Sequence, residues 1–417
     1  MFYGFFRFFG TGYTVHCFYE SYKKDVDVND YYIDPKKANK ERILGLFFLH
    51  DALSKPQIAE LTGFSLPTIN GHMKDLENMG MIGPGELMDS SGGRPAISYR
   101  LLPRSKLALG AEIRKDFVKI CLCDLKGEVV KLWNIGIEYK NEKAYSAKLN
   151  SLLKEAISTC GYPLDNILGI GVAIQGVVNK AGTEIIFSKI LDTSELDLEI
   201  IKKDISIPVR LCHDVKTAAL AELWHNRKIS NGIYIAMSEH LGGSLIKSRC
   251  IEHGRSGYAG SWDHVTFSNK GKLCYCGKRG CIDTYCNFET LFEGESIPDF
   301  FFKLREEKSK EYKVRWSKYL STIAFGLYQA WLILERRIIL GGELAMWLNP
   351  EDVAFVENEI INRSTFTCRP GFVIKANVEH HACAIGAALP YLADEIPEPV
   401  RPIEGWSTYC KPEIIEY

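Results

Sequence analysis

The sequence lacks any uninterrupted apolar run near the roughly 18 residues that a membrane-spanning helix needs, so we expect no membrane partner. It also lacks a strong net charge: 51 Lys and Arg residues face 52 Asp and Glu residues, which leaves −1 at pH 7. A nucleic-acid-binding role would therefore have to rest on a local basic patch. Neither an internal repeat of solenoid length nor a low-complexity tract is present, so the pattern is not that of a repeat protein.

A paired set of cysteines, of the kind that small secreted domains carry, is absent as well. The 13 cysteines are odd in number and scattered over 417 residues, which favours a reducing compartment, and we expect a cytoplasmic protein. The composition, 46% apolar and 25% charged, is typical of a globular protein that is long enough for two or three domains.

Residues 1–35 form an N-terminal extension that is crowded with aromatic side chains. A secretory signal would have a Leu- and Ala-like apolar stretch and a small-residue cleavage site, and this segment has neither. Three interpretations stay open: an unstructured or wrongly started extension, an arm that packs on a partner, and a targeting segment.

Residues 36–106 have the pattern of a winged helix-turn-helix. Apolar residues on one face predict its first helix, namely Ile43, Leu44, Leu46, Phe47 and Leu49. Ser54 is a favoured N-cap and Gly63 a favoured residue just after a helix, so a second, short helix is expected between them. This second helix is expected to bury Ile58 and Leu61.

A third helix should begin after the N-cap residue Ser65 and turn Ile69, Met73 and Leu76 inward. In a helix-turn-helix this helix enters the DNA major groove, and the outward residues of its first half meet the base edges. The residues that we predict to contact DNA are Ser65, Pro67, Thr68, Asn70, Gly71 and Lys74.

A hairpin follows, with one strand near Met81–Ile82, a second at Ala96–Leu101, and a tip at residues 91–95. Arg94 at this Gly-rich tip can reach phosphates or a minor groove, and we add it to the DNA-binding set. From Lys36 to Lys106 there are ten Lys or Arg residues against seven Asp or Glu residues, a modest local excess of positive charge. A helix-turn-helix can also serve as a docking module for a protein partner, but the pattern favours double-stranded DNA.

Residues 257–286 contain a metal-ligand pattern, His-x9-Cys-x-Cys-x4-Cys. One imidazole and three thiolates are the set that a closed, tetrahedral structural zinc site needs, and they leave no position for a reactive water. We therefore predict a structural Zn²⁺ held by His264, Cys274, Cys276 and Cys281. The alternatives are a cluster of free thiols beside an unrelated His, or Cys286 as a substitute ligand.

The same segment resembles the ROK family (repressors, open reading frames and sugar kinases), whose pattern is Glu-x-Gly-His followed by Cys-x-Cys-Gly-x-x-Gly-Cys-x-Glu. The second half matches closely from Cys274 to Asp283. The first half is altered, because Ser261 stands where the family has a sugar-binding Glu and Asp263 where it has Gly. A helix pair and wing ahead of such a body resemble the transcriptional-repressor branch, that of N-acetylglucosamine and xylose repressors, and the resemblance covers residues 40 to about 395.

The phosphate-binding loops of the family's kinases are changed in this chain. Where the family has Asp-x-Gly-Gly-Thr, residues 112–116 lack both glycines and carry Glu112 and Asp116; where it has Gly-Thr-Gly, Glu239 is the central residue. Carboxylates facing a polyphosphate would repel it, so the resemblance implies a chain that is not a kinase. The family's general base is matched by Asp214, the only catalytic candidate if some kinase activity remains, although an Asp at the end of a strand is as often a helix cap.

The expected fold class is α/β: the winged helix-turn-helix is followed by a two-lobed actin-like, sugar-kinase (ROK) fold with a zinc-binding loop. The predicted divisions are an extension (1–35), the winged helix-turn-helix (36–106), lobe 1 (107–230), lobe 2 with the zinc loop (231–378), a closing helix (379–396) and a Pro-rich tail (397–417). The resemblance implies effector-binding residues at His213, Asp214, Ser261, His264 and Asp283.

These expectations combine into one hypothesis, a ROK-type repressor that binds operator DNA and responds to a sugar or sugar derivative. The family implies a homodimer or homotetramer. Two alternatives stay open: a diverged sugar kinase, and a dimerisation scaffold that senses no ligand.

Overall fold

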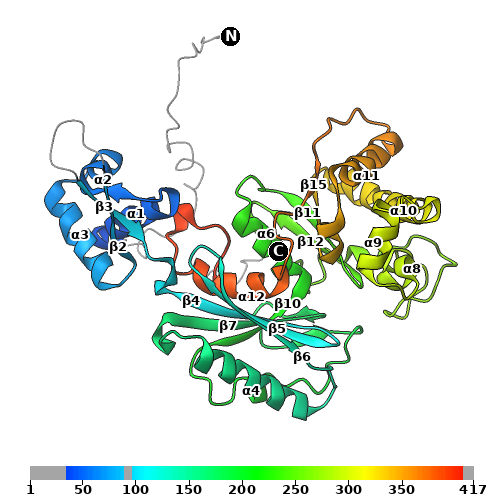
Figure 1. Cartoon of the computed structure of the whole chain (residues 1–417), viewed down its shortest axis with the longest axis horizontal. Coiled ribbons are helices and arrows are strands. Elements are labelled where there is room, and N and C mark those ends of the chain that lie inside the picture. The colour runs from blue at the N-terminus through cyan, green and yellow to red at the C-terminus, as the bar shows by residue number, and fades with distance from the viewer. Residues whose placement is uncertain (1–33, 89–95, 407–417) are drawn as a thin grey trace, which may run out of the picture.

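The computed structural model describes residues 34–88 and 96–406 (Figure 1). Nearly all of the aromatic extension, the wing tip with Arg94, and the end of the tail lie outside the described residues, and the predictions made for them stay predictions. Among the described residues, no helix combines the length and the apolarity that crossing a membrane requires.

The N-terminal unit is a winged helix-turn-helix, as predicted. Its core is built from the inward residues of three helices, with Ile43, Ile58, Ile69, Met73 and Leu76 all fully buried. A small antiparallel sheet of order β1-β3-β2 completes the unit. The elements are α1 (Pro35–Leu49), β1 (Leu53–Ser54), α2 (Lys55–Thr62), α3 (Leu66–Asn78), β2 (Ile82–Met88) and β3 (Ala96–Leu101).

Both predicted helix starts are confirmed by their capping bonds. The backbone N–H of Ser54 donates to Gln57 Oε1 at 2.9 Å, and Ser65 Oγ accepts from the backbone N–H of Thr68 at 3.4 Å. Helix α2 ends at Gly63, whose φ of +73° favours glycine. These bonds satisfy backbone donors that would otherwise be unpaired at the helix starts.

The burial predicted for Leu61 is wrong, and Leu49, predicted to lie on the apolar face of the first helix, is outside the core. Leu49 is 63% exposed and Leu61 is 47% exposed. Leu49 is the last residue of α1, where the helix has already passed the end of the core. In α2 the buried face is formed by Ile58 and Thr62, one turn apart, and the Thr62 hydroxyl avoids an unpaired state by donating to the Ile58 carbonyl at 2.6 Å.

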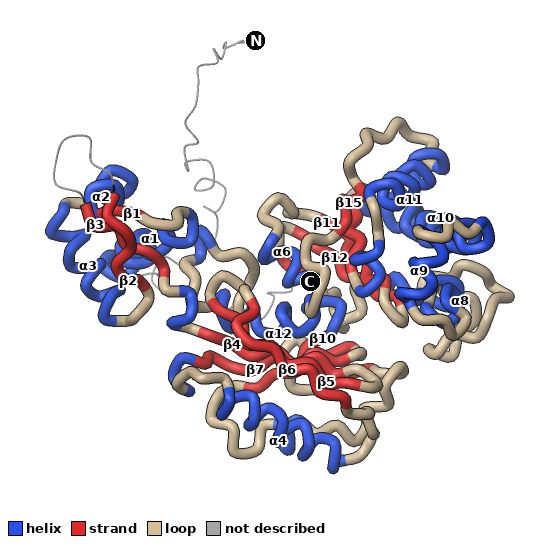
Figure 2. Tube along the Cα trace, viewed as in Figure 1, coloured by secondary structure: helices blue, strands red, loops and turns tan. Residues whose placement is uncertain are grey.

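Lobe 1 is a five-stranded mixed sheet of order β10-β7-β4-β5-β6 (Figure 2). Helix α4 covers one face, where Leu109, Ile120 and Leu153 share a core, and helix α12 covers the other. The turn at Lys126–Gly127 lies between β5 and β6, and Gly127 has a φ of +80°. The elements are β4 (Leu107–Ile113), β5 (Phe117–Asp124), β6 (Val129–Gly136), α4 (Lys143–Thr159), β7 (Ile167–Ile174), β8 (Val177–Val178), β9 (Ile185–Phe187), α5 (Leu198–Ile201) and β10 (Val209–His213).

Lobe 2 is a second five-stranded sheet, of order β13-β12-β11-β14-β15. Alternate residues of β11 separate its two faces: Ile233 and Ile235 pack in the core formed with α9, α10 and α11, whereas Tyr234 and Ala236 belong to the core around α6 and α12. The elements are β11 (Gly232–Met237), β12 (Leu241–Lys247), β13 (Cys250–Glu252), α7 (Asp283–Cys286), α8 (Phe288–Phe292), α9 (Ile297–Arg305), α10 (Lys310–Leu334), β14 (Arg337–Gly341), α11 (Pro350–Arg363) and β15 (Val373–Lys375), and the two helices between the sheets are α6 (Asp214–His225) and α12 (Ala382–Ala393).

Helices α6 and α12 pack against each other between the two sheets (Figure 1). Their approach is close enough to require glycine. A Cβ atom on Gly110 of β4 would collide with the backbone carbonyl of Ala384, and a Cβ atom on Gly386 would collide with the carbonyl of Thr217 in α6. The closing helix is therefore in backbone contact with both lobe 1 and α6, and it holds the lobes in one arrangement.

We predict that Gly110→Ala lowers the free energy of unfolding by about 1–3 kcal/mol, because α12 must move away from β4. Gly136→Ala is the matched control, since it lies in the same sheet and a Cβ there meets no atom within 4 Å. Thermal unfolding of both variants tests this. Equal stability of the two would contradict the close-packing argument.

Candidate functional site

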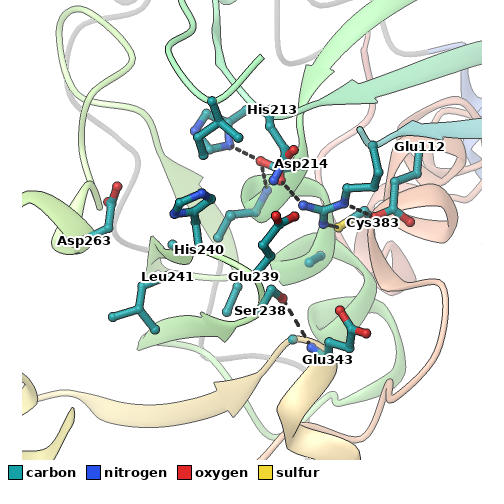
Figure 3. A pocket seen from close by; sticks show the side chains of 18 of the residues that line it. Glu112, His213, Asp214, Ser238, Glu239, His240, Leu241, Asp263, Glu343 and Cys383 are labelled. Carbon is teal, nitrogen blue, oxygen red and sulfur yellow. Dashed lines mark hydrogen bonds and ion pairs between the residues drawn. The ribbon is translucent and has the colours of Figure 1, made fainter. Parts of the chain in front are cut away.

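A cavity of about 880 Å³ lies between the two lobes (Figure 3). Lobe 1 contributes the end of β4 and the loop after β7, α6 contributes its first residues, and lobe 2 contributes the loop between β11 and β12 and the segment that leads into the metal-ligand loop. The carboxyl ends of strands meet here, which is where ligands bind in open α/β sheets.

Four of the five predicted effector residues line this cavity, namely His213, Asp214, Ser261 and His264. Asp283 does not line it and is only 1% exposed. Its two carboxylate oxygens accept bonds from His240 Nδ1 at 3.0 Å and from the backbone N–H of Leu241 at 2.8 Å. In this structure Asp283 therefore holds the loop between β11 and β12 from behind rather than facing the cavity, and the pKa of His240 is raised because Asp283 outweighs the effect of burial.

A buried ion cluster forms the lobe 1 side of the cavity. Arg114 Nε lies 2.7 Å from Glu112 Oε1, and its Nη1 lies 3.3 Å from Asp214 Oδ2. The remaining nitrogen, Nη2, lies 3.6 Å from Cys383 Sγ at the start of α12. One guanidinium thus connects β4, α6 and α12, the three elements that meet behind the cavity.

The pKa shifts in this cluster follow from its geometry. Burial opposes the charge of Arg114, but Glu112 and Asp214 outweigh it and the pKa of Arg114 is raised. Burial also opposes the charge of Asp214, but His213 at 3.4 Å and Arg114 outweigh it, so the pKa of Asp214 is lowered. Asp214 is therefore held as a carboxylate, and its Oδ1 also caps the first turn of α6 by accepting from Val215 N–H at 2.8 Å.

Arg114, Glu343 and Cys383 line the cavity as well, although no role was predicted for them from the sequence. Arg114 follows Glu112 by two residues at the end of a strand, and that spacing, which places both side chains on one face, could have revealed the pair. No sequence signal was available for Glu343, which joins the site because its backbone N–H donates to Ser238 Oγ at 3.2 Å.

The positions predicted to face a phosphate do face the cavity. Glu112, Asp116 and Glu239 all line it, and Glu343 adds a fourth carboxylate whose pKa is raised by burial. Figure 3 shows Glu239 and Glu343 beside the Ser238 loop, with Glu112 and Asp214 opposite.

The four predicted metal ligands are brought together. Their ligand atoms lie within 4.8 Å of one another, with Cys276 Sγ 3.7 Å from Cys281 Sγ. Tetrahedral zinc with sulfurs at about 2.3 Å places neighbouring sulfurs roughly 3.8 Å apart, so the donor set and its spacing fit this ion. Gly277 and Gly280, with φ of +89° and +79°, provide the tight turns between the thiols. Cys286 lies in the lobe 2 core, outside this group.

The predicted DNA-contacting residues of α3 form an accessible surface. Five of the six are exposed and Thr68 is half-buried. The opposite face of α3, with Ile69, Met73 and Leu76, is fully buried. The recognition helix is therefore free to meet a duplex, whereas Arg94 lies outside the described residues.

Comparisons with known proteins agree with this architecture. Residues 108–394 match the profile of the ROK family, and residues 37–82 match a winged helix-turn-helix DNA-binding profile. A xylose repressor of Caldicellulosiruptor bescii is 24% identical over 61% of this chain and 65% of its own length. An N-acetylglucosamine repressor of Escherichia coli O6:H1 is 23% identical over 60% of this chain and 62% of its own length. The chain thus spans less than two thirds of each relative.

A solved structure shares the fold. It is titled a ROK family transcriptional regulator, homologous to the E. coli MLC protein, and it superposes with a TM-score of 0.68 at 19% identity over 88% of this chain and 98% of its own. The predicted fold class, a winged helix-turn-helix ahead of a two-lobed body, is confirmed.

We predict that Arg114→Met lowers the free energy of unfolding by about 3–5 kcal/mol near neutral pH, because it leaves buried carboxylates unpaired. Without Arg114 the pKa of Asp214 rises, so protonation relieves the loss in acid and the deficit grows as the pH is raised. Denaturant titrations at several pH values measure this.

The exposed pair Lys202–Glu199, 2.7 Å apart, gives the control. Lys202→Met should cost under about 1 kcal/mol. Adding Asp214→Asn to Arg114→Met should restore part of the stability, and a deficit that is small or independent of pH would contradict the assignment.

Proposed function

Because the chain belongs to the ROK family, we propose that it is a transcriptional repressor of this family, which binds operator DNA through α3 and the wing and is controlled by a sugar or sugar derivative in the cavity between the lobes. The observation that carries the proposal is the combination, on one chain, of an exposed recognition helix and a cavity whose phosphate-facing positions are acidic. Two of its relatives are named a xylose repressor and an N-acetylglucosamine repressor, and these names support this function.

The charges of the cavity argue against kinase activity. Phosphoryl transfer depends on groups that hold and neutralise a polyphosphate. Here Glu112, Asp116 and Glu239 take the positions expected to face a phosphate, and although four lysines also line the cavity, the guanidinium of Arg114 is already paired with Glu112 and Asp214. A general base must also take a proton from a sugar hydroxyl, and the lowered pKa of Asp214 makes it a weak base for that step.

The effector is expected to contact His213, Asp214, Ser261 and His264, which face one cavity from both lobes. Ser261 is too short to span a sugar ring as the family's Glu does, and His213 offers an imidazole in place of an amide. We therefore propose an altered sugar-like ligand. Asp283 acts through the loop that it holds, by its bonds to His240 and Leu241.

Helix α6 offers a route from the cavity to the DNA-binding unit. Its first residue, Asp214, belongs to the cavity cluster. Near its far end, Trp224 Nε1 donates to the carbonyl of Lys126 at 2.8 Å, in the turn that also carries the Lys126–Asp51 ion pair with the DNA-binding unit. Closure of the lobes around a ligand would displace both ends of this rigid helix together.

A second contact at that end involves the segment after α12. Arg249 donates from Nη1 to the carbonyl of Ile229 at 2.7 Å and from Nε to the carbonyl of Pro402 at 3.1 Å, so it ties the segment after α6 to the C-terminal segment. The same C-terminal segment packs on α1, where Val400 lies against Gly45. The effector would thereby bias two arrangements of the DNA-binding unit, which is the requirement for allostery.

Three further features belong to the proposal. The Cys/His cluster would hold a structural Zn²⁺, which would brace the loop that carries His264. A homodimer or homotetramer would match a two-fold operator. We also propose a cytoplasmic location, which the odd and scattered set of 13 cysteines supports.

Two alternatives remain distinct. A diverged sugar kinase would transfer phosphate from ATP to a sugar, and Asp214→Asn would abolish that transfer; absence of ATP binding by calorimetry would end this alternative. A dimerisation scaffold would bind neither DNA nor sugar. The retained 880 Å³ cavity with its convergent polar groups favours a sensing body over a scaffold.

We predict that Thr68→Ala weakens binding to the selected operator by about 1–3 kcal/mol because a base-edge contact is lost. Lys74→Ala and Arg94→Ala should weaken binding to all duplexes and lower the salt dependence by about one charge each. Fluorescence anisotropy at several salt concentrations measures both effects. Lys154→Ala, on α4 of lobe 1, is the control, and wild-type binding by Thr68→Ala and Arg94→Ala together would refute the DNA-binding assignment.

We also predict that Arg249→Met keeps operator binding but reduces its response to the effector, because the tie to Pro402 is lost. Xylose and N-acetylglucosamine are the first effectors to test, and a coupling of about 1–3 kcal/mol is expected in the wild type. Arg336→Met is the control. Arg336 donates to the Ile246 carbonyl at 3.1 Å and takes no part in this route. An unchanged response in Arg249→Met would contradict the route.

A further inference from the structure

Asp263 is a buried carboxylate beside a metal ligand. It stands in the short 3₁₀ turn Trp262–His264 and is 8% exposed. Its Oδ2 lies 3.2 Å from His264 Nε2 and accepts from the Tyr275 hydroxyl at 2.9 Å. A carboxylate with this degree of burial needs partners, and here both partners belong to the metal-ligand loop.

The opposite side of the His264 ring faces the thiols. Nδ1 lies 3.9 Å from Cys274 Sγ, within the group whose ligand atoms are all within 4.8 Å. The two ring nitrogens therefore face different groups: Nε2 lies beside the Asp263 carboxylate, and Nδ1 faces the thiols. Carboxylates that bond the outer nitrogen of a metal-binding His fix its tautomer and make it a stronger ligand.

We propose that Asp263 is the positioning residue of the zinc centre, which orients His264 so that Nδ1 faces the ion. This inference rests on the proposed structural Zn²⁺. The residue concerned departs from the ROK pattern, because Asp263 stands where the family has Gly.

Tyr275 completes the arrangement. It lies between two of the thiol ligands, Cys274 and Cys276, so the ligand loop itself supplies the donor that holds Asp263. The Tyr275 ring packs edge-on against His264 at 5.2 Å and against His240 at 4.8 Å between ring centroids. Asp263, Tyr275 and His240 also line the cavity, so the support of the metal centre forms part of the wall that a ligand would touch.

A purely structural role for Asp263 makes a different prediction. If the carboxylate only fills space in the turn, its replacement would lower thermal stability without changing how the metal is held. If it orients His264, replacement would weaken metal binding and alter the ligand field even in variants that fold normally.

The experiment is a competition titration of the full-length protein with a chromophoric chelator, after metal analysis of wild type purified without chelators. Wild type should carry about one zinc per chain. Asp263→Ala should bind zinc about 10- to 100-fold more weakly. Asp263→Asn keeps the shape and one acceptor oxygen and should fall between the two, and it guards against failure of the alanine variant to fold. Tyr275→Phe should show a smaller loss.

Cobalt substitution adds a second readout, the absorption spectrum of bound Co²⁺, which a change in stability alone would not alter. Co²⁺ spectra of Asp263→Asn should differ from wild type in the ligand-field bands. Glu199→Gln, an exposed carboxylate of lobe 1 outside the metal-ligand group, is the control and should match wild type in affinity and spectrum.

The outcomes separate the two claims. Wild type without stoichiometric zinc overturns the proposed metal itself. Wild type with zinc, together with unchanged affinity and unchanged Co²⁺ spectra in both Asp263 variants, overturns the positioning role while the zinc stands.

Discussion

The backbone contact of helix α12 with lobe 1 and with α6 is the constraint on which the rest of the structure depends. Glycine is required on the sheet side at Gly110 and Gly171 and on the helix side at Gly386, because a Cβ atom at any of them would meet a backbone carbonyl. Main-chain packing of this kind deforms little, since neither surface can adjust around the other. The cavity, the Arg114 cluster and the docking of the DNA-binding unit are all built on this helix or on the segment that follows it.

Helices α6 and α12 contact the cavity at one end, and the segments near their other ends contact the DNA-binding unit. At one end, Cys383 of α12 and Asp214 of α6 meet Arg114, so an occupant of the cavity acts on the very groups that fix the lobes. At the other end, the chain after α12 passes beside Arg249 and lies against α1 of the winged helix-turn-helix. A ligand that prefers one lobe arrangement would therefore also prefer one position of the recognition helices, by linkage and without any further device.

Much of this could be predicted from sequence, and the failures have physical reasons. Local signals gave the helix starts at Ser54 and Ser65 and the metal-ligand group, since capping and ligand spacing depend on residues a few positions apart. Leu61 was placed wrongly, and Leu49 lies outside the core, because periodicity says which residues share a face but not where the core ends. Arg114 and Cys383 are far apart in sequence, so their contact depends on the packing of α12. Asp283 fits a family position, yet bonds to His240 and Leu241 draw its carboxylate away from the cavity.

The central claim is that this chain recognises specific DNA and that a small molecule in its cavity changes that recognition. The most direct measurement is selection of bound fragments from the source genome by purified full-length protein at moderate salt, repeated with candidate sugars. The account predicts an enriched palindromic motif whose recovery changes with one sugar, and the neighbouring genes would name that sugar. A folded, zinc-loaded protein that enriches no motif would contradict the account and favour the scaffold interpretation.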